Sequence, residues 1–240
     1  MLNLITPNWS VPQSIKAFST TRKGGNSSKP YDSLNLGGHV GDDVESVKAN
    51  RALLPVPLAP CWLNQVHSTE TIEFAETIFA PLTADGCFSN RPQQVCVVMT
   101  ADCLPVLLTD SEGSFVAAIH CGWKGMANGI LEKFLKTRKN LNGVIAWLGP
   151  AIGPNAFEVD KDVLAVFPEE REAFQSIVNK GISQKKYQAN IFQIATMKLQ
   201  RLGVSQIYSE QQCTFSDSEN FFSYRRDGTT GRMASFIWIE

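Results

Sequence analysis

The sequence predicts a single α+β domain that spans residues 1–240. β-rich and helical patterns are mixed along the chain without the regular strand–helix–strand alternation of a parallel α/β fold, and no Gly-rich phosphate-binding motif follows a strand. No repeat, low-complexity tract or Gly/Ser linker divides the sequence. A chain of this length buries roughly 70% of the surface that its unfolded form exposes, so its core needs no disulfide support.

The N-terminal half combines short strands with one long loop and one helix. Residues 15–20 predict a strand, and the Gly-, Ser- and Asn-rich residues 21–43 predict a long ordered loop. Asp42 or Asp43 is the expected N-cap of a helix that runs to about residue 54, where prolines end it. Further strands are predicted over residues 61–67, 95–101, 105–110 and 114–122, with a hairpin turn at 110–113.

The C-terminal half predicts three helices and three strands. Apolar residues at helical spacing and a basic last turn favour a helix over residues 126–140. Residues 143–153 predict a strand that enters a Gly/Pro loop. Helices over 160–174 and 190–203 follow, the second ended by Gly203, and late strands are expected at 204–210 and 232–240.

Charge and composition exclude several classes of partner. Lys and Arg total 22 against 23 Asp and Glu, so no basic excess is available to bind nucleic acid. No apolar run approaches the ~18 residues of a transmembrane helix, and the N-terminus lacks a signal-peptide pattern, so we expect a cytoplasmic protein that binds no membrane. Without a coiled-coil signal, we expect a monomer. The six scattered cysteines are expected to be reduced.

Three predicted strand ends carry His67, Cys103 and His120. Two imidazoles and one thiolate fit a zinc ion that keeps a fourth position open, which is the pattern of a catalytic site. The alternative is a buried cysteine and two satisfied core histidines. Cys61, Cys87 and Cys96 lie in apolar segments and are expected in the core, and Cys121 should point away from His120 on its strand.

Several motifs occur in a fixed order that resembles a known family. From about Ser19 to the C-terminus, the chain is similar to the YfiH-like family, also called the laccase-domain or polyphenol-oxidase-like family, through the segments LNQVHS, MTADCLPVLL, AIHCGWKG, WLGPAIGPNAFEV, CTF and FFSYRRDGTTGRMASFIW. The resemblance implies sheets packed face to face with helices outside (α/β/β/α), like the catalytic domain of cytotoxic necrotizing factor. It also implies that His67, Cys103 and His120 are zinc ligands.

The same resemblance implies activity on purine nucleosides with phosphate as co-substrate. Members of the family act as phosphorylases on adenosine, inosine, guanosine and methylthioadenosine and as adenosine deaminases, and a bacterial relative is described as a peptidoglycan editing factor. The chain reads HCGWKG where the family commonly has HAGWRG, so Cys121 and Lys124 depart from the pattern. Lysine keeps the charge but loses the bidentate fork of arginine.

Phosphorolysis needs cations beside the phosphate and the departing purine. Lys124 precedes a predicted helix, and Arg22 and Asn35 lie in the Gly-rich loop, so all three are expected to contact substrate or phosphate. Arg225 is a further candidate, because one of Arg225 and Arg226 should point inward if their segment is extended. Solvated surface charge is the alternative for each of them.

Asp102 is a candidate catalytic group because it adjoins Cys103. Deamination requires an acidic group that moves a proton near the zinc, and Asp102 or Asp85 could provide it. Asp102 could equally orient a ligand histidine.

Two rival activities use the same residues. Copper could replace zinc, with Met99 or Met126 as an axial ligand, and give a copper-dependent polyphenol oxidoreductase, although His39 alone cannot supply the further imidazoles of a multicopper site. Alternatively, Cys103 could be the nucleophile of a cysteine hydrolase or amidase that acts on peptidoglycan precursors, with His120 or His67 as its base. A structural zinc in a binding protein is less favoured, since no further histidine is placed to close the site. We expect a zinc-dependent purine nucleoside phosphorylase that also deaminates adenosine.

Overall fold

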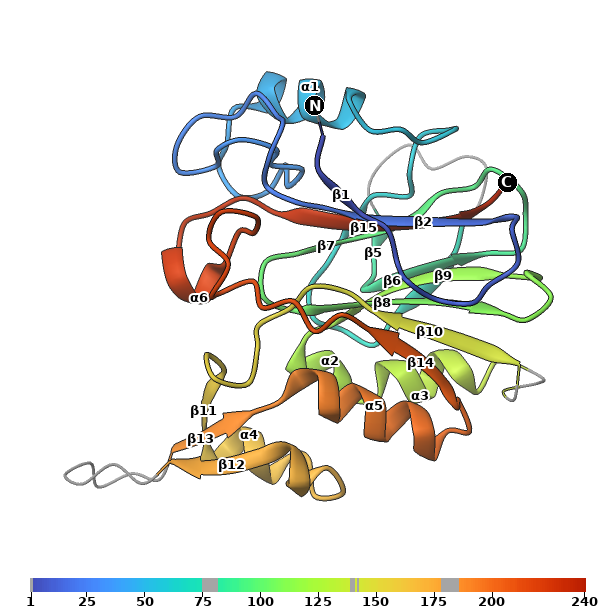
Figure 1. The fold of residues 1–240 in the computed structure, drawn as a ribbon, viewed down its shortest axis with the longest axis vertical. Helices are drawn as coiled ribbons and strands as arrows, with labels where there is room; N and C mark the ends of the chain where they lie inside the picture. The colour runs from blue at the N-terminus through green and yellow to red at the C-terminus, as the bar shows by residue number, and fades with distance from the viewer. Residues whose placement is uncertain (1, 75–81, 139–140, 142, 178–185) are drawn as a thin grey trace.

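Two β-sheets lie face to face and carry helices on their outer sides. The computed structural model describes residues 2–74, 82–138, 141, 143–177 and 186–240. Helix α1 and the N-terminal loop cover the outer face of the smaller sheet, whereas α2, α3 and α5 cover the outer face of the larger one (Figure 1). This order of layers confirms the predicted α+β fold of the α/β/β/α type.

The smaller sheet is antiparallel and joins the two ends of the chain. Its order is β1-β2-β15-β7, and Ser19 of β2 lies opposite Ser235 of β15. Pairing over this sequence distance cannot be read from local patterns. The strands are β1 (Leu4–Ile5), β2 (Ile15–Thr20), β7 (Cys96–Thr100) and β15 (Met233–Ile239).

The larger sheet has the order β14-β10-β8-β9-β6-β4 and mixes parallel and antiparallel pairs. Strands β8 and β9 are the predicted hairpin at its centre. The strands are β4 (Thr71–Glu73), β6 (Gly86–Ser89), β8 (Leu104–Asp110), β9 (Val116–Cys121), β10 (Val144–Leu148) and β14 (Gln206–Ser209).

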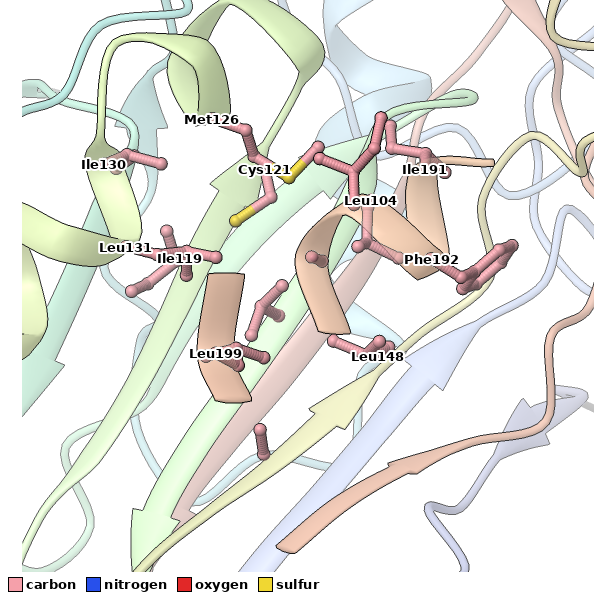
Figure 2. Packing of buried hydrophobic residues seen from close by; sticks show 14 of the residues in the cluster. Leu104, Ile119, Cys121, Met126, Ile130, Leu131, Leu148, Ile191, Phe192 and Leu199 are labelled. Atoms are coloured by element: carbon pink, nitrogen blue, oxygen red, sulfur yellow. The ribbon is translucent and has the colours of Figure 1, made fainter. Parts of the chain in front are cut away.

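Successive side chains of β9 point to opposite faces of the larger sheet and so belong to two different core clusters. Ile119 and Cys121 pack under the helices with Leu131 and Leu199 (Figure 2). Ala118 faces the other sheet, in the cluster that also holds the buried Cys61, Cys87 and Cys96. Cys121 thus points away from His120, as predicted, and the three other cysteines lie in the core, as predicted.

Two of the predicted helices form with a side-chain cap at the N-terminus. Asp43 caps α1 (Val44–Ala52) by accepting the N–H of Ser46, and Asn190 caps α5 (Ile191–Arg201) by accepting the N–H of Gln193. Gly203 follows α5 with a φ of +91°, a conformation that glycine adopts without strain.

Other boundaries differ from the predictions. The helix predicted over residues 126–140 is split into α2 (Trp123–Ala127) and α3 (Ile130–Leu135) at Gly129, whose φ is +87°; residues 139–140 lie outside the described residues. The helix predicted over 160–174 is only α4 (Lys161–Ala165), followed by the short 3₁₀ turn η1 (Arg171–Ala173). Pro168 explains this break, because proline removes a helical N–H donor.

The segment predicted as a strand to His67 is extended only at β3 (Leu63–Asn64), which pairs with β5 (Leu82–Thr83). Residues 174–177, expected at the end of a helix and beyond it, form β12 of a small sheet with order β11-β13-β12. Its strands are β11 (Glu158–Asp160), β12 (Phe174–Ile177) and β13 (Lys186–Ala189). Among the described residues, no helix is long and apolar enough to cross a membrane.

Candidate metal centre and its pocket

His67, Cys103 and His120 meet at one point. One ligand atom from each lies within 4.8 Å of the others, and Cys103 Sγ is 3.6 Å from His67 Nε2. His67 follows β3, Cys103 lies between β7 and β8, and His120 is near the end of β9. The structure therefore brings the three predicted residues together in a group that could hold a metal ion.

Asp85 fixes both histidines from behind. Its buried carboxylate accepts the backbone N–H groups of His67 (2.9 Å) and Ser68 (2.6 Å) and lies 2.8 Å from His120 Nδ1. The hydroxyl of Ser68 (2.8 Å) and the N–H of Val66 (3.2 Å) also donate to this carboxylate. With Nδ1 of His120 held in this way, Nε2 is the nitrogen left for a metal. Sequence reasoning considered Asp85 only as a proton carrier.

The charged forms of Cys103, His120 and Asp85 stabilise one another. Burial opposes ionisation of Cys103, but the charge of His120 and hydrogen bonds from both histidines bring its pKa down to about 6. Burial likewise opposes a charged His120, yet the Cys103 thiolate and Asp85 raise its pKa to about 9. Burial of Asp85 is outweighed by hydrogen bonds from His120 and Ser68, which lower its pKa to about 2. Without a metal, the centre is therefore a thiolate, an imidazolium and a carboxylate in a row.

The donor set fits a four-coordinate metal ion. Bond lengths of about 2.0 Å to nitrogen and 2.3 Å to sulfur place tetrahedral ligand atoms roughly 3.5 Å apart, close to the observed 3.6 Å. Gly122 makes room for this approach, because a Cβ there would lie 2.7 Å from His67 Cδ2 and 3.1 Å from Cys103 Sγ. The residues present can hold a metal with one position open to a ligand.

The centre lies at a cavity of about 450 Å³, a size typical of small-molecule sites. Apolar and aromatic side chains and several cations share its lining. The apolar and aromatic residues are Met99, Trp123, Ile152, Phe157, Ile191 and Tyr224, and the basic ones besides the ligands are His39, Lys124, Arg225 and Arg232.

Two of the four predicted substrate-binding residues line this cavity, namely Lys124 and Arg225. Arg225 comes from α6 (Tyr224–Asp227), a short helix where an extended segment was considered. Its Nη1 donates to the carbonyls of Ala156 and Glu158, so the side chain also ties α6 to β11. The neighbouring Arg226 is absent from the lining and donates to the carbonyls of Thr214, Phe215 and Phe221.

Arg22 and Asn35 do not line the cavity, which corrects their predicted role. Arg22 donates to the carbonyls of Asp32 and Ser218. Asn35 is fully buried, where it bonds Asp42 and receives the N–H of Arg232. Both side chains hold the long N-terminal loop in place instead of facing a substrate.

Asp102 lines the cavity, but it does not orient a histidine. Its oxygens accept hydrogen bonds from Thr214 Oγ1 (2.7 Å), Ser223 Oγ (3.0 Å) and the N–H of Arg225 (2.7 Å). Asp102 therefore ties the Cys103 loop to the C-terminal segment, while Asp85 is the carboxylate that holds His120.

Sequence reasoning missed His39, Gln65 and Arg232 as lining residues. His39 stands in the Gly-rich loop that drew attention to Asn35, and Arg232 begins the last predicted strand, so each had a signal nearby. Gln65 pairs with the backbone of Met99 through two hydrogen bonds of 2.7 and 2.8 Å. Of the two methionines considered as axial ligands, Met126 packs in the core beneath the helices (Figure 2).

Comparison with known proteins extends these observations. A family described as multi-copper polyphenol oxidoreductase laccase matches residues 16–240. A Haemophilus influenzae protein named purine nucleoside phosphorylase is 50% identical, and an Escherichia coli protein named purine nucleoside phosphorylase YfiH is 46% identical; each alignment covers 100% of both chains.

Solved structures share the fold over nearly the whole chain. A Neisseria meningitidis protein superposes with a TM-score of 0.91 at 42% identity and covers 99% of each chain. YlmD from Geobacillus stearothermophilus superposes with a TM-score of 0.84 at 29% identity and covers 95% of this chain and 93% of its own. The fold thus agrees with that of relatives whose sequences have diverged considerably.

Proposed function

The chain belongs to the family described as multi-copper polyphenol oxidoreductase laccase, and from this membership and its site we propose that it is a zinc-dependent purine nucleoside phosphorylase. The observation that carries the proposal is the His67–Cys103–His120 group in a cavity lined by both aromatic rings and cations. Relatives up to 50% identical over their full length bear the same activity in their names.

The donor set fits a zinc site better than it fits a copper oxidase centre. Two imidazoles and one thiolate provide three protein ligands and leave a fourth position open, which is the pattern of catalytic zinc sites. A multicopper oxidase needs more imidazole ligands than the three histidines of this sequence provide. Met99 lines the cavity, yet its Sδ is directed to Arg51 Nη2 at 4.0 Å. Bound zinc would supply a Lewis acid that stabilises negative charge in the cavity.

In the proposed reaction, a phosphate oxygen attacks C1′ of the nucleoside while the bond from C1′ to N9 breaks. The electron pair of that bond goes to the purine, which takes up a proton, and ribose 1-phosphate and the free base leave. The rings of Trp123 and Phe157 offer faces for stacking the purine. Lys124, whose Nζ lies 5.6 Å from the Trp123 ring centroid, places a positive charge beside that base.

We propose adenosine, inosine, guanosine and methylthioadenosine as substrates. Stacking on aromatic rings is tolerant of the substituent at purine C6, because every purine presents a π-face. The apolar side chains of Ile152 and Ile191 offer a surface on which a methylthio group could pack without loss of a hydrogen bond.

Deamination of adenosine is a second proposed activity. It replaces the 6-amino group by oxygen from water and releases ammonia, so a group near the metal must carry a proton. Asp102 is the one carboxylate among the described residues that line the cavity, and three donors already occupy it. The site therefore supports phosphorolysis better than deamination.

One observation favours a different class of enzyme for the metal-free protein. Asp85, His120 and Cys103 stand in the order carboxylate, imidazole and thiol that activates cysteine nucleophiles. A cysteine hydrolase or amidase acting on peptidoglycan precursors is thus the second candidate. Zinc would inhibit such an enzyme by occupying its nucleophile, whereas it would support the phosphorylase.

The deciding experiment is chromatography of adenosine incubated with the zinc-loaded protein, with and without phosphate. Phosphorolysis gives adenine and ribose 1-phosphate only when phosphate is present, whereas deamination gives inosine in both cases. Cys103→Ala should abolish both products, and Cys213→Ala is the matched control because Cys213 is the other cysteine that is only partly buried. Absence of either product from the zinc-loaded protein would refute the proposed function.

We also propose that the protein acts as a cytoplasmic monomer. Light scattering coupled to size-exclusion chromatography should give a mass near 26.5 kDa. A mass of twice that value would contradict the monomer.

A further inference from the structure

The cavity has two chemically different walls. One wall belongs to the core beneath the helices and presents Trp123, Ile152, Phe157 and Ile191. The other wall comes from the N-terminal loop and the start of β15, and it presents His39 and Arg232. The N-terminal loop lies on the side of the smaller sheet, whereas α2 and α5 lie on the side of the larger sheet (Figure 1). A substrate with an apolar part and an anionic part is suited to such a cavity.

Arg232 is held rigidly before any ligand arrives. Its Nη1 donates to the carbonyls of Thr230 (3.0 Å) and Gly231 (2.9 Å), and its backbone N–H donates to Asn35 Oδ1 (2.9 Å). Its Cγ packs so closely on Gly37 that a Cβ there would lie 2.8 Å away. Nε and Nη2 of Arg232 have no acceptor within the described part of the chain, so two donor nitrogens of a fixed guanidinium are free for a ligand.

This guanidinium has no directly paired carboxylate, although the charges of Cys103 and Asp102 act on it from a distance. Within the described residues, no carboxylate lies within 4.0 Å of Arg232, although the side chain is partly buried. Asp102 is the nearest candidate on the lining, but Thr214, Ser223 and Arg225 hold both of its oxygens. Because no carboxylate pairs directly with this partly buried cation, an anion bound beside it gains charge-assisted hydrogen bonds.

His39 adds a second polar group to the same wall. Burial and the nearby charges of Arg232 and Arg51 lower the pKa of His39, so its imidazole lies close to both guanidinium groups. The guanidinium of Arg51 already has an acceptor within the protein, since its Nε and Nη2 donate to the carbonyl of Leu36 at 3.0 and 2.7 Å. His39 and Arg232 are therefore the groups on this wall that remain available to a ligand.

We propose that Arg232, assisted by His39, binds the phosphate co-substrate on the wall opposite the purine. This inference rests on the proposed phosphorylase activity and specifies where its second substrate binds. The two free donors of Arg232 can bind two phosphate oxygens, and a third oxygen is then directed across the cavity toward C1′. As that oxygen forms its bond to C1′, the bond to N9 breaks and its electron pair leaves with the base, which is protonated.

The first test separates the two substrates kinetically in the zinc-loaded enzyme. Arg232→Gln should raise the KM for phosphate by about 30-fold or more while the KM for the nucleoside changes by less than about threefold. Arg232→Lys should give a KM for phosphate between those of the wild type and Arg232→Gln, because lysine keeps the positive charge but lacks the two-pronged guanidinium group. His39→Gln should raise the phosphate KM by about fivefold. Arg171→Gln, on the exposed turn η1, is the matched control.

The second test does not depend on turnover. Titration calorimetry of inorganic phosphate into the zinc-loaded protein should show binding by the wild type and by Arg171→Gln, and at least about tenfold weaker binding by Arg232→Gln. Zinc content and thermal unfolding of each variant confirm that the site and the fold are retained.

The outcomes distinguish the two proposals. If phosphate binds through Arg232 but no nucleoside is converted, the oxyanion subsite stands and the phosphorylase proposal fails. If nucleosides are converted and Arg232→Gln leaves the phosphate KM and affinity unchanged, the subsite is wrong. The proposed phosphate subsite is also overturned if the wild type fails to bind phosphate, or if Arg232→Gln raises the KM for phosphate and the KM for the nucleoside equally.

Discussion

One oxygen of Asp85 holds both histidines of the metal centre. Oδ1 lies 2.8 Å from Nδ1 of His120 and accepts the backbone N–H of His67 at 2.9 Å. The distance between the two imidazoles therefore depends on a buried carboxylate that contacts neither of the expected metal-binding nitrogens. His67 also has a φ of +60°, which is uncommon for a residue other than glycine and is sustained by these hydrogen bonds.

Replacing Asp85 should weaken the metal site without removing a ligand. Asp85→Asn loses the charge that orients His120, and we expect the zinc affinity to fall by about 10- to 100-fold. Competition with a chromophoric chelator measures this directly. Asp110→Asn changes a carboxylate at the end of β8 and should leave the affinity unchanged. An equal loss in both variants would refute the role of Asp85.

The low pKa of Asp85 also predicts a pH-dependent contribution to stability. Its pKa falls from 3.8 to about 2 on folding, so the charged form stabilises the fold above about pH 4, and this contribution is lost as the pH falls through 2. The shift corresponds to about 2 kcal/mol. Denaturant unfolding of the metal-free proteins should show wild type more stable than Asp85→Asn at pH 6 by about this amount, with the gap closing toward pH 2. A constant gap would contradict the prediction.

Gly122 should be intolerant of a side chain. A Cβ at this position would lie 2.7 Å from His67 Cδ2, so Gly122→Ala must displace the imidazole or the backbone of α2. We expect the zinc affinity to drop by at least about tenfold. In the control Gly38→Ala, the nearest atom is Arg51 Nη2 at 4.0 Å. Unchanged zinc binding by Gly122→Ala would show that the ligands can move apart without loss.

Cys103 should react as a thiolate near neutral pH when no metal is bound. Its pKa of about 6 predicts that iodoacetamide labelling of the metal-free protein reaches half its maximal rate near pH 6 instead of near pH 9. Peptide mass spectrometry distinguishes Cys103 from Cys213. Zinc should protect Cys103, because the metal would occupy the sulfur. Asp85→Asn should move the midpoint upward, since a less stabilised imidazolium at His120 lowers the thiolate fraction. A midpoint near pH 9 in the wild type would exclude the thiolate.

Local chemistry made parts of the fold predictable. Asp43 and Asn190 cap helices because their side chains satisfy free N–H groups, and this requires no partner distant in sequence. The strands β2, β8 and β9 follow from their apolar β-rich segments, although the pairing of β2 with β15 does not. The break at Gly129 and the shortness of α4 were missed, because helical periodicity outweighed the glycine in the first segment and the proline in the second.

The sequence by itself determined the donor set of the candidate metal centre. With only three histidines in the chain, His67 and His120 beside Cys103 were recognisable as a zinc-type donor set from residue types and strand ends. Their motifs also identified the family, since residue order alone carries that information.

The tertiary structure decided which other residues serve that centre. Asp85 replaced Asp102 as the carboxylate behind His120, and Arg232 and His39 took the place of Arg22 and Asn35 on the cavity wall. The reason is physical: a hydrogen bond or a cavity wall depends on where distant strands and loops meet, as when β15 brings Arg232 beside Asn35 and Gly37. Residue type alone tells which groups can bind, and the packing of the sheets determines which of them do.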